Sequence, residues 1–397
     1  MPIEFREYVP ADAEPVCDLL NGIFTSAPMT QEGWAAWASA DFTAPVAVLD
    51  GEPVGAIPLC RRTYRAAPDA EVVAWVEHRV GVREDLRDQG VGSCMQACAK
   101  SFLQGRGDVL LVYRGAERSD GYRFYDNNGL HDVAYIRTVS LEPTDAKIDG
   151  VRWLDPDEFL AADAPWLAIF HDCYGHCGGF PQRGPGYLRR LVRGIWKGAI
   201  RTHMAYAVLE EAGQPTGYLV LGQRQASPSD GPRQVMELAV ADGSVDRARR
   251  LLLAACDRGA PVHYRLTAPS PLAPVLDDLG VAWPPRQGAS MIMAHVLDIE
   301  SAARKVWRPV PALHDVEVRV WTPLREGVLH QPDRPARTLT IELKEPMLSR
   351  LLLRRLDLAA AVAEERITLC GARPGDPDAL ARALPPCPWV YHQIDYL

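Results

Sequence analysis

Residues 80–93 read Val80-Gly81-Val82-Arg83-Glu84-Asp85-Leu86-Arg87-Asp88-Gln89-Gly90-Val91-Gly92-Ser93. They follow an extended run from Val72 to Val82 and open a segment whose apolar residues recur at helical spacing as far as Leu103. We therefore expect a helix from about Gly90 to Leu103, with one apolar face that packs on a sheet. A strand, a glycine-punctuated loop and such a helix form the unit from which α/β domains are built.

The start of this helix has the chemistry of an anion site. Gly90 and Gly92 place no bulky side chain over the first amides, and glycine allows a close approach to the backbone. Free N–H groups at a helix N-terminus carry about half a positive charge and bind pyrophosphate, and Arg87 adds a fixed cation. A tight turn beside a solvated Arg87 is the structural alternative. A dinucleotide-binding loop is disfavoured because the next strand ends in Tyr113-Arg114 instead of an acid.

The pattern Arg87-x-x-Gly90-x-Gly92 resembles the acyl-CoA signature of the general-control-related N-acetyltransferases (GNAT). In that family the loop amides hold the coenzyme A pyrophosphate, and the backbone of the preceding strand pairs with pantetheine and polarises the thioester carbonyl. The expected order of elements, β-α-α-β-β-β-α-β-α-β, resembles the same fold. It includes a hairpin that runs from Pro45–Leu49 through Asp50-Gly51 to Val54–Arg62, because Asp-Gly is a strong hairpin signal. By this resemblance the cofactor-binding residues are Val80, Gly81, Val82, Arg87, Asp88, Gln89, Gly90, Val91, Gly92 and Ser93.

The same resemblance implies a catalytic acid. The segment from Arg123 to Leu130 resembles the family's tyrosine-x-x-x-glycine-aromatic segment, with Leu130 in the aromatic position. The matching Tyr125 would protonate the departing thiolate, and a phenol of pKa near 10 is close enough to a thiol near 8.5 for efficient proton transfer. Tyr122 and Tyr113 compete for the role, and the structural alternative for Tyr125 is a packed aromatic.

The whole chain resembles a narrower group, the enhanced-intracellular-survival (Eis) acetyltransferases. The implied fold is α/β (α+β), with tandem GNAT-like domains of mixed sheets and a sterol-carrier-protein-like C-terminal domain. We expect a catalytic domain at 1–145, a degenerate second GNAT-like domain at 146–305 and the C-terminal domain at 306–397. Strand, helix and strand around residues 234–266 repeat those around 72–112. The repeat lacks Arg-x-x-Gly-x-Gly and is expected to bind no coenzyme A.

The resemblance also implies a base, the terminal carboxylate of Leu397. An α-carboxylate of low pKa is a weak base by itself, but it could hold the ammonium and relay a proton through water. A frayed terminus is the structural alternative, although the apolar ending from Ile394 to Leu397 favours docking. Glu77, on the extended run before the glycine loop, is a second candidate base.

The composition of the chain limits the kinds of binding partner that we expect. The chain has 43 Lys and Arg against 51 Asp and Glu, which gives a net charge of −8, so we expect no nucleic acid and no anionic membrane as partner. The N-terminus shows no secretory pattern, and nine scattered cysteines favour reduced thiols in the cytoplasm. The cluster His171–Cys177 offers no second ligand pair, so no metal is predicted. By resemblance we expect a homo-oligomer.

These observations predict an N-acetyltransferase that moves the acetyl group of acetyl-CoA to a small-molecule primary amine. Aminoglycosides, polyamines, lysine and amino natural products fit as acceptors, because a cationic amine is attracted by an acidic pocket. Two alternatives stay open. One is a non-catalytic binder of acyl-CoA or lipid, and the other is a biosynthetic acyltransferase with a longer acyl donor.

Overall fold

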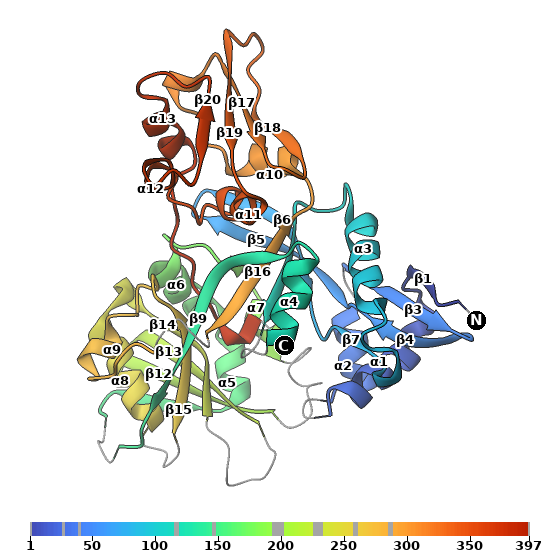
Figure 1. Ribbon diagram of the computed structural model, residues 1–397. Coiled ribbons are helices and arrows are strands. Elements are labelled where there is room, and N and C mark those ends of the chain that lie inside the picture. The colour runs from blue at the N-terminus through green and yellow to red at the C-terminus, as the bar shows by residue number, and fades with distance from the viewer. Residues whose placement is uncertain are drawn as a thin grey trace.

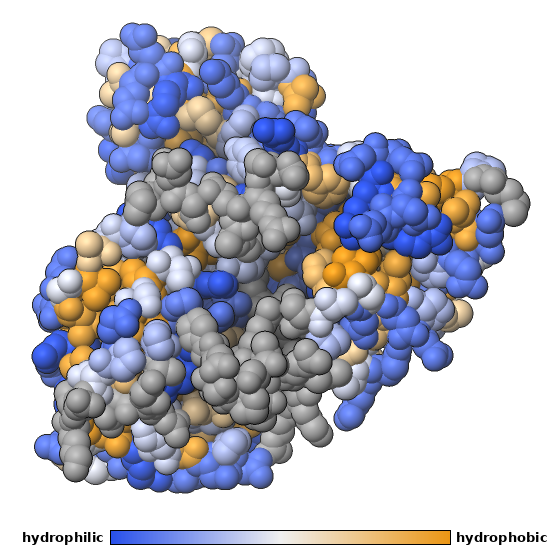
Figure 2. Space-filling model, turned by 60° about the horizontal axis from the view of Figure 1, so that its bottom comes forward, coloured by the Kyte–Doolittle hydropathy of each residue, from blue (hydrophilic) through white to orange (hydrophobic). Residues whose placement is uncertain are grey.

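The computed structural model describes residues 2–25, 28–38, 41–114, 119–144, 148–192, 202–224, 233–256, 261–284 and 289–395. The chain forms three lobes around a long, twisted central sheet, with the N-terminal lobe at the right of Figure 1, the C-terminal lobe at the top and the middle of the chain at the left. Figure 2 shows a recess between the N-terminal lobe and the other two, with hydrophobic residues of the N-terminal lobe beside it.

The N-terminal lobe is built on a small sheet. Its strands are, in order, β1 (Glu4–Glu7), β3 (Pro45–Leu49), β4 (Glu52–Ala56) and β7 (Gly81–Val82). The turn between β3 and β4 has positive φ at Asp50 (56°) and Gly51 (87°), as a two-residue hairpin requires, so the hairpin predicted from Asp-Gly is confirmed. Helices α1 (Ala13–Ile23) and α2 (Gln31–Ala38) belong to the core on one side of this sheet, and α3 (Val91–Leu103) to the core on the other.

The central sheet combines strands of residues 42–141 with strands of residues 151–296. Its strands are, in order, β10 (Val151–Leu154), β12 (Thr202–Glu211), β13 (Gln214–Arg224), β14 (Arg233–Val240), β15 (Val262–Thr267), β9 (His131–Leu141), β16 (Ser290–Val296), β8 (Val109–Arg114), β6 (Ala70–Glu77), β5 (Leu59–Ala67) and β11 (Phe180–Pro181), with β2 (Phe42–Thr43) also paired to β5.

The central sheet is continuous because β9 and β16 link its two parts. The first half of β9 pairs with β16 and its second half with β15, while β16 also pairs with β8. The parallel pair β6 and β8 is connected through α3, and the parallel pair β14 and β15 is connected through α8 (Val245–Cys256). The internal repeat predicted from the sequence is therefore present as two strand–helix–strand units in one sheet.

Short helices cover the sheet. They are α4 (Ser119–Asn127), which follows β8, and α5 (Pro156–Ala161), α6 (Asp163–Tyr174), α7 (Tyr187–Arg190) and α9 (Val275–Asp278) in the middle of the chain. Within the described ranges, no helix is both long and apolar enough to cross a membrane.

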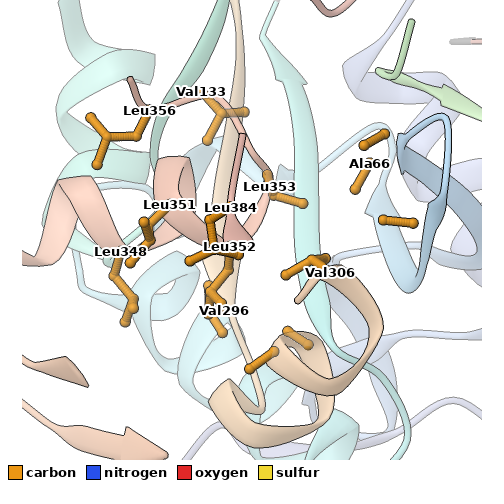
Figure 3. Close-up of a cluster of buried hydrophobic side chains, with 14 of the residues drawn as sticks. Ala66, Val133, Val296, Val306, Leu348, Leu351, Leu352, Leu353, Leu356 and Leu384 are labelled. Carbon is orange, nitrogen blue, oxygen red and sulfur yellow. The ribbon is translucent and has the colours of Figure 1, made fainter. Parts of the chain in front are cut away.

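The C-terminal lobe has its own sheet of β18 (Glu326–His330), β17 (Val316–Trp321), β19 (Arg337–Glu342) and β20 (Thr368–Cys370), with helices α10 (Ile299–Val306), α11 (Glu345–Leu352), α12 (Leu358–Ala363) and α13 (Asp376–Ala383). Figure 3 shows how it joins the central sheet: Leu348, Leu351 and Leu352 of α11 gather with Val296 of β16. Burial of each such side chain contributes about 1.5–3 kcal/mol, so the lobe is held by a core shared with the central sheet.

Candidate active site

The central and N-terminal sheets separate at one point. Strand β6 pairs with β8 only as far as Glu77 opposite Val112, and the chain then re-forms as β7, which pairs with β4 instead. At the break Arg79 adopts φ of +45°, and the amide of His78 donates to the carbonyl of Pro58 over 2.9 Å. Val80 lies between β6 and β7 and belongs to neither strand. The chain therefore no longer pairs with β8 beyond Glu77, and an opening forms between β7 and the end of β8.

This break corrects two expectations. We predicted continuous extended runs over 54–62 and 72–82, whereas each divides between two sheets, into β4 and β5 and into β6 and β7. Pro58 lacks an N–H and cannot continue a ladder, and the left-handed backbone of Arg79 turns the neighbouring strand at the same level. The physical reason lies in the pairing of the two runs with each other, which neither pattern reveals alone.

The register of β7 turns the backbone N–H and C=O of one residue toward the opening. The Arg83 amide donates to the Val54 carbonyl over 2.8 Å, and Val82 lies opposite Gly55. Hydrogen-bonded and non-bonded pairs alternate in an antiparallel ladder, so the N–H and C=O of Val82 point away from β4. The Val82 N–H is therefore presented at the free edge where the two sheets part.

Helix α3 begins directly beside this edge, within one residue of the predicted start. Asp88 (φ 61°) and Gly90 (φ 79°) both adopt left-handed backbone, and Gly90 forms the N-cap. Residues 87–90 are exposed. The N–H groups of Val91, Gly92 and Ser93 donate to no backbone carbonyl in the ranges that the structure describes, which leaves a set of bare donors at a helix start. We call this set of bare donors the cradle; that it binds an anion stays a prediction.

The side chains around the cradle leave it open. A Cβ at Gly90 would meet nothing within 4 Å, whereas one at Gly92 would lie 2.9 Å from Cε2 of Phe124 on α4. The Nε of Arg87 donates to the Val82 carbonyl over 3.2 Å, so this guanidinium connects the loop to the exposed edge of β7. Gly92 thus lets α4 approach the helix start, and Arg87 keeps a cation beside the amides.

Glu77, the last residue of β6, lies on the face of the strand that carries Trp75 and packs beneath α3. Its side chain is 2% exposed, and its Oε2 accepts from the Nε2 of Gln96 on α3 over 2.8 Å. Burial raises the pKa of Glu77 to about 8, although the Gln96 bond and the charge of Lys100 oppose this. Sequence reasoning missed Gln96, whose signal was a polar residue on the apolar face of the helix.

Tyr125 on α4 is the candidate acid whose pKa responds to the charge of Glu77. It is half-buried and packs against the core beneath α3, and burial, reinforced by the charge of Glu77, raises its pKa. The other two candidates lie elsewhere: Tyr122 stacks under the guanidinium of Arg114 at 5.6 Å, and the Tyr113 hydroxyl accepts from Arg265 over 3.0 Å. Tyr125 is thus the candidate whose hydroxyl shares the environment of Glu77.

The C-terminal tail crosses the molecule in an ordered path as far as Asp395. The indole of Trp389 donates to the Ala66 carbonyl over 2.9 Å. The carboxylate of Asp395 accepts from Arg183 over 3.0 and 3.1 Å and from Tyr187 over 2.7 Å. Arg183 also pairs with Glu237 at 2.5 Å. Leu397 lies outside the described residues, and sequence reasoning missed the anchor, because Arg183 and Asp395 are 212 residues apart.

The second strand–helix–strand unit has no equivalent cradle. Before α8, the Asp242 amide donates to the carboxylate of Asp172 over 2.7 Å. The Arg247 amide, in the first turn of the helix, donates to the Ser244 hydroxyl over 3.4 Å. Side chains therefore accept hydrogen bonds from N–H groups around the start of α8, whereas the N–H groups at the start of α3 are bare. This unit also lacks the glycine pattern of α3.

The suspected cluster at 171–177 is mostly buried core. Cys173 and Cys177 are fully buried, and burial raises the pKa of each thiol to about 12, so neither favours the thiolate that binds metals. No group of three metal-ligating side chains comes together in the ranges described.

Neither a family profile nor a curated protein sequence matches the chain. Solved structures do match it over its full length. A conserved protein of unknown function and probable N-acyltransferase from Enterococcus faecalis V583 superposes with a TM-score of 0.71 at 13% identity, covering 100% of both chains. A GCN5-related N-acetyltransferase from Kribbella flavida gives 0.64 at 17% identity, covering 98% of both. Eis1 from Mycobacterium abscessus gives 0.60 at 14%, covering 98% of this chain and 99% of that one.

The chain therefore has the fold of the GCN5-related N-acetyltransferases, in the full-length arrangement of Eis1. This confirms the resemblance drawn from Arg87-x-x-Gly90-x-Gly92. At these identities the likeness concerns the fold, and the activity is argued from the site.

Proposed function

We propose that this protein is an N-acetyltransferase that transfers the acetyl group of acetyl-CoA to a primary amine. One observation carries the proposal: the bare amides that open α3 lie beside the free edge of β7, at the place where the sheet parts. The bare amides suit a diphosphate, and the free strand edge suits an extended thioester arm. The fold shared with N-acetyltransferases supports the same conclusion.

In this proposal the backbone from Asp88 to Ser93 holds the pyrophosphate, with Arg87 as the adjacent cation. Asp88 contributes its amide, and its carboxylate is exposed in the same loop. Val80 and Val82 offer their backbone to the pantetheine arm, and Gly81, whose own N–H and C=O face β4, joins these two residues. The residues fit this group because residues 87–90 are exposed and a Cβ at Gly90 would meet only open space.

The transfer itself needs three groups. The neutral amine attacks the thioester carbonyl, and the Val82 N–H, which points into the opening, stabilises the negative oxygen of the tetrahedral intermediate. As the C–S bond breaks, the Tyr125 hydroxyl donates its proton to the sulfur. The Tyr125 phenol is protonated at neutral pH, as a general acid requires. Burial raises its pKa and so makes it a weaker acid than a free phenol.

The terminal carboxylate of Leu397 is the base that we propose for the amine. It follows by two residues an Asp395 side chain that is fully buried and held by Arg183 and Tyr187, which supports a docked tail over a frayed one. Glu77 is the alternative, but its side chain faces α3 and is 2% exposed. An amine would therefore reach Glu77 only through a water path.

The remaining parts of the proposal concern the acceptor, the domain division, the location and the oligomeric state. We propose a small-molecule amine as acceptor, such as an aminoglycoside, a polyamine, lysine or an amino natural product, with no nucleic acid or membrane involved. The three-part division at 1–145, 146–305 and 306–397, the sterol-carrier-protein-like character of the last part, a cytoplasmic location and a homo-oligomeric state remain predictions from the sequence.

The decisive experiment measures thiol release from acetyl-CoA against a panel of amines, with wild type and Tyr125→Phe. We expect turnover on at least one amine and a loss of about 10²-fold or more in kcat for Tyr125→Phe. Binding of acyl-CoA without turnover on any amine would instead identify a non-catalytic binder. Preference for a longer acyl-CoA over acetyl-CoA would identify a biosynthetic acyltransferase.

A further inference from the structure

The C-terminal tail meets the end of β8 at the place where the sheet parts, and in Figure 1 the chain ends in the middle of the molecule. Strand β8 loses its partner β6 after Val112, which lies opposite Glu77, so the next residue, Tyr113, lies at the opening. The ring of Tyr113 stacks on the ring of Tyr391 from the tail, with centroids 5.0 Å apart and planes 29° apart. Tyr391 is 4% exposed. A buried residue of the tail is therefore packed against the first residue of β8 beyond its pairing with β6.

An arginine from the second strand–helix–strand unit joins the same contact. The Nη1 of Arg265, on β15, donates to the hydroxyl of Tyr113 over 3.0 Å and to Oε1 of Gln393 over 2.8 Å. The Tyr391 hydroxyl donates to the same Oε1 over 2.7 Å. One guanidinium thus links β15, β8 and the tail. Because the donor is charged, its hydrogen bonds are stronger than those between neutral groups.

This junction lies on the face of the sheet opposite the cradle. Successive side chains of a strand point to opposite faces. Val112 belongs to the core beneath α3, whereas Leu111 and Tyr113 pack in the core on the other face. The cradle opens α3, and Tyr125 packs in the core beneath that helix. The tail therefore reaches the opening from the face opposite the proposed cofactor site.

We propose that Arg265 is a positioning residue, which fixes the C-terminal tail at the opening on the face opposite the cradle. The proposal rests on the proposed function, in which the tail carries the base for the amine. It gives the second strand–helix–strand unit, which has no cradle of its own, a part in the reaction of the first. Asp395 is held separately by Arg183, so the tail is fixed at both ends of the single turn Gln393–Asp395.

The second point of attachment sets the direction of the tail. Chain termini fray unless they are tied down, and an anchor at Asp395 alone would let the neighbouring residues rotate about it. The bond from Arg265 to Gln393 removes this freedom and so sets the direction in which the chain leaves Asp395. We therefore expect loss of Arg265 to disturb the reaction with the amine and to leave the binding of acetyl-CoA unchanged.

Steady-state kinetics with an amine that the acetyl-CoA assay identifies test this split. Arg265→Met should lower kcat/KM for the amine by about tenfold or more, since a hydrogen bond from a charged donor is worth at least that factor, with KM for acetyl-CoA unchanged. Arg265→Lys keeps a charged donor and should recover part of the loss. The matched control is His263→Gln, two residues away on the same face of β15 and also half-buried, which should match wild type.

Hydrogen exchange of the C-terminal peptide, followed by mass spectrometry, supplies a readout apart from activity. The Asp395 amide donates to the His392 carbonyl over 3.1 Å, so its exchange reports opening of the tail. The peptide should exchange about tenfold faster in Arg265→Met. Gln393→Ala removes the acceptor from the tail and should show the same change, while His263→Gln should exchange as wild type does.

Each outcome bears on a separate claim. Unchanged exchange of the tail in both Arg265→Met and Gln393→Ala would overturn the junction. A looser tail with an unchanged kcat/KM for the amine, or an equal loss of affinity for acetyl-CoA, would overturn the positioning role. Wild type without turnover on any amine would overturn the proposed function itself, and hydrogen exchange would still report whether Arg265 holds the tail.

Discussion

Replacement of Gly90 by alanine tests the cradle through its backbone alone. Gly90 adopts φ of +79°, and a Cβ there would meet nothing within 4 Å, so Gly90→Ala adds strain without a clash. An L-residue in the left-handed region costs about 1–2 kcal/mol. Residues 87–90 are exposed, and the loop is therefore free to relax in the unbound protein. Relaxation moves the amides away from the geometry that a diphosphate needs.

Binding must then restore the strained geometry. If the full 1–2 kcal/mol is recovered from the binding energy, the dissociation constant of coenzyme A rises by about five- to thirty-fold, since every 1.4 kcal/mol is a factor of ten. Isothermal titration calorimetry measures this directly. Pantetheine, which has no diphosphate, should bind Gly90→Ala as it binds wild type, because it makes no use of the helix start.

Gly105→Ala is a matched control from the other end of the same helix. Gly105 also has positive φ, at +72°, and open space around its Cβ. Gly105→Ala should therefore lower the free energy of unfolding by about 1–2 kcal/mol and leave the affinity for coenzyme A unchanged. Equal affinity for coenzyme A in Gly90→Ala and wild type, or an equal loss in both variants, would refute the reasoning that the left-handed cap shapes the binding site.

Three further predictions follow from the site and the tail. Tyr125→Phe should lower kcat by about 10²-fold or more with little change in KM for acetyl-CoA, while Tyr122→Phe on the same helix should retain most activity; steady-state kinetics that show the reverse would move the acid to Tyr122. Arg183→Met leaves two buried carboxylates without their cation, so urea unfolding should show a loss of about 3–5 kcal/mol. The exposed control Glu158→Gln, which loses only a surface pair with Arg152, should cost about 1 kcal/mol or less, and similar losses in both would argue against a buried anchor. Burial raises the pKa of Glu77 from 4.5 to about 8, so the unfolded chain releases a proton above pH 4.5 that the folded chain keeps, and stability declines as the pH rises between the two values. Glu77→Gln lacks that decline and should gain at least about 1 kcal/mol relative to wild type between pH 5 and pH 9; parallel stability curves would contradict the raised pKa.

Local signals made the centre of this fold predictable. Gly90 as a cap and the apolar residues that follow it determine where α3 starts and ends, and both are read within one segment of sequence. The Asp50-Gly51 hairpin was predictable for the same reason. The extended run over 72–82 was not, because its break depends on Pro58, between β4 and β5, and on the backbone of Arg79.

The site was predictable where it depends on backbone and not where it depends on distant partners. Glycines at a helix start predict an anion site from one segment of sequence. The hydrogen bond between Gln96 and Glu77 instead joins α3 to β6, which only the fold brings together. The anchor between Arg183 and Asp395 joins residues 212 positions apart, and no local pattern marks either of them. Buried polar pairs therefore had to be found in the structure.

A crystal structure of the complex with coenzyme A is the most direct test of the central claim. We predict that diphosphate oxygens lie within hydrogen-bond distance of the main-chain N–H groups between Gly90 and Ser93, with the pantetheine arm along Val82. Coenzyme A bound at a different place, with those N–H groups facing only solvent, would contradict it.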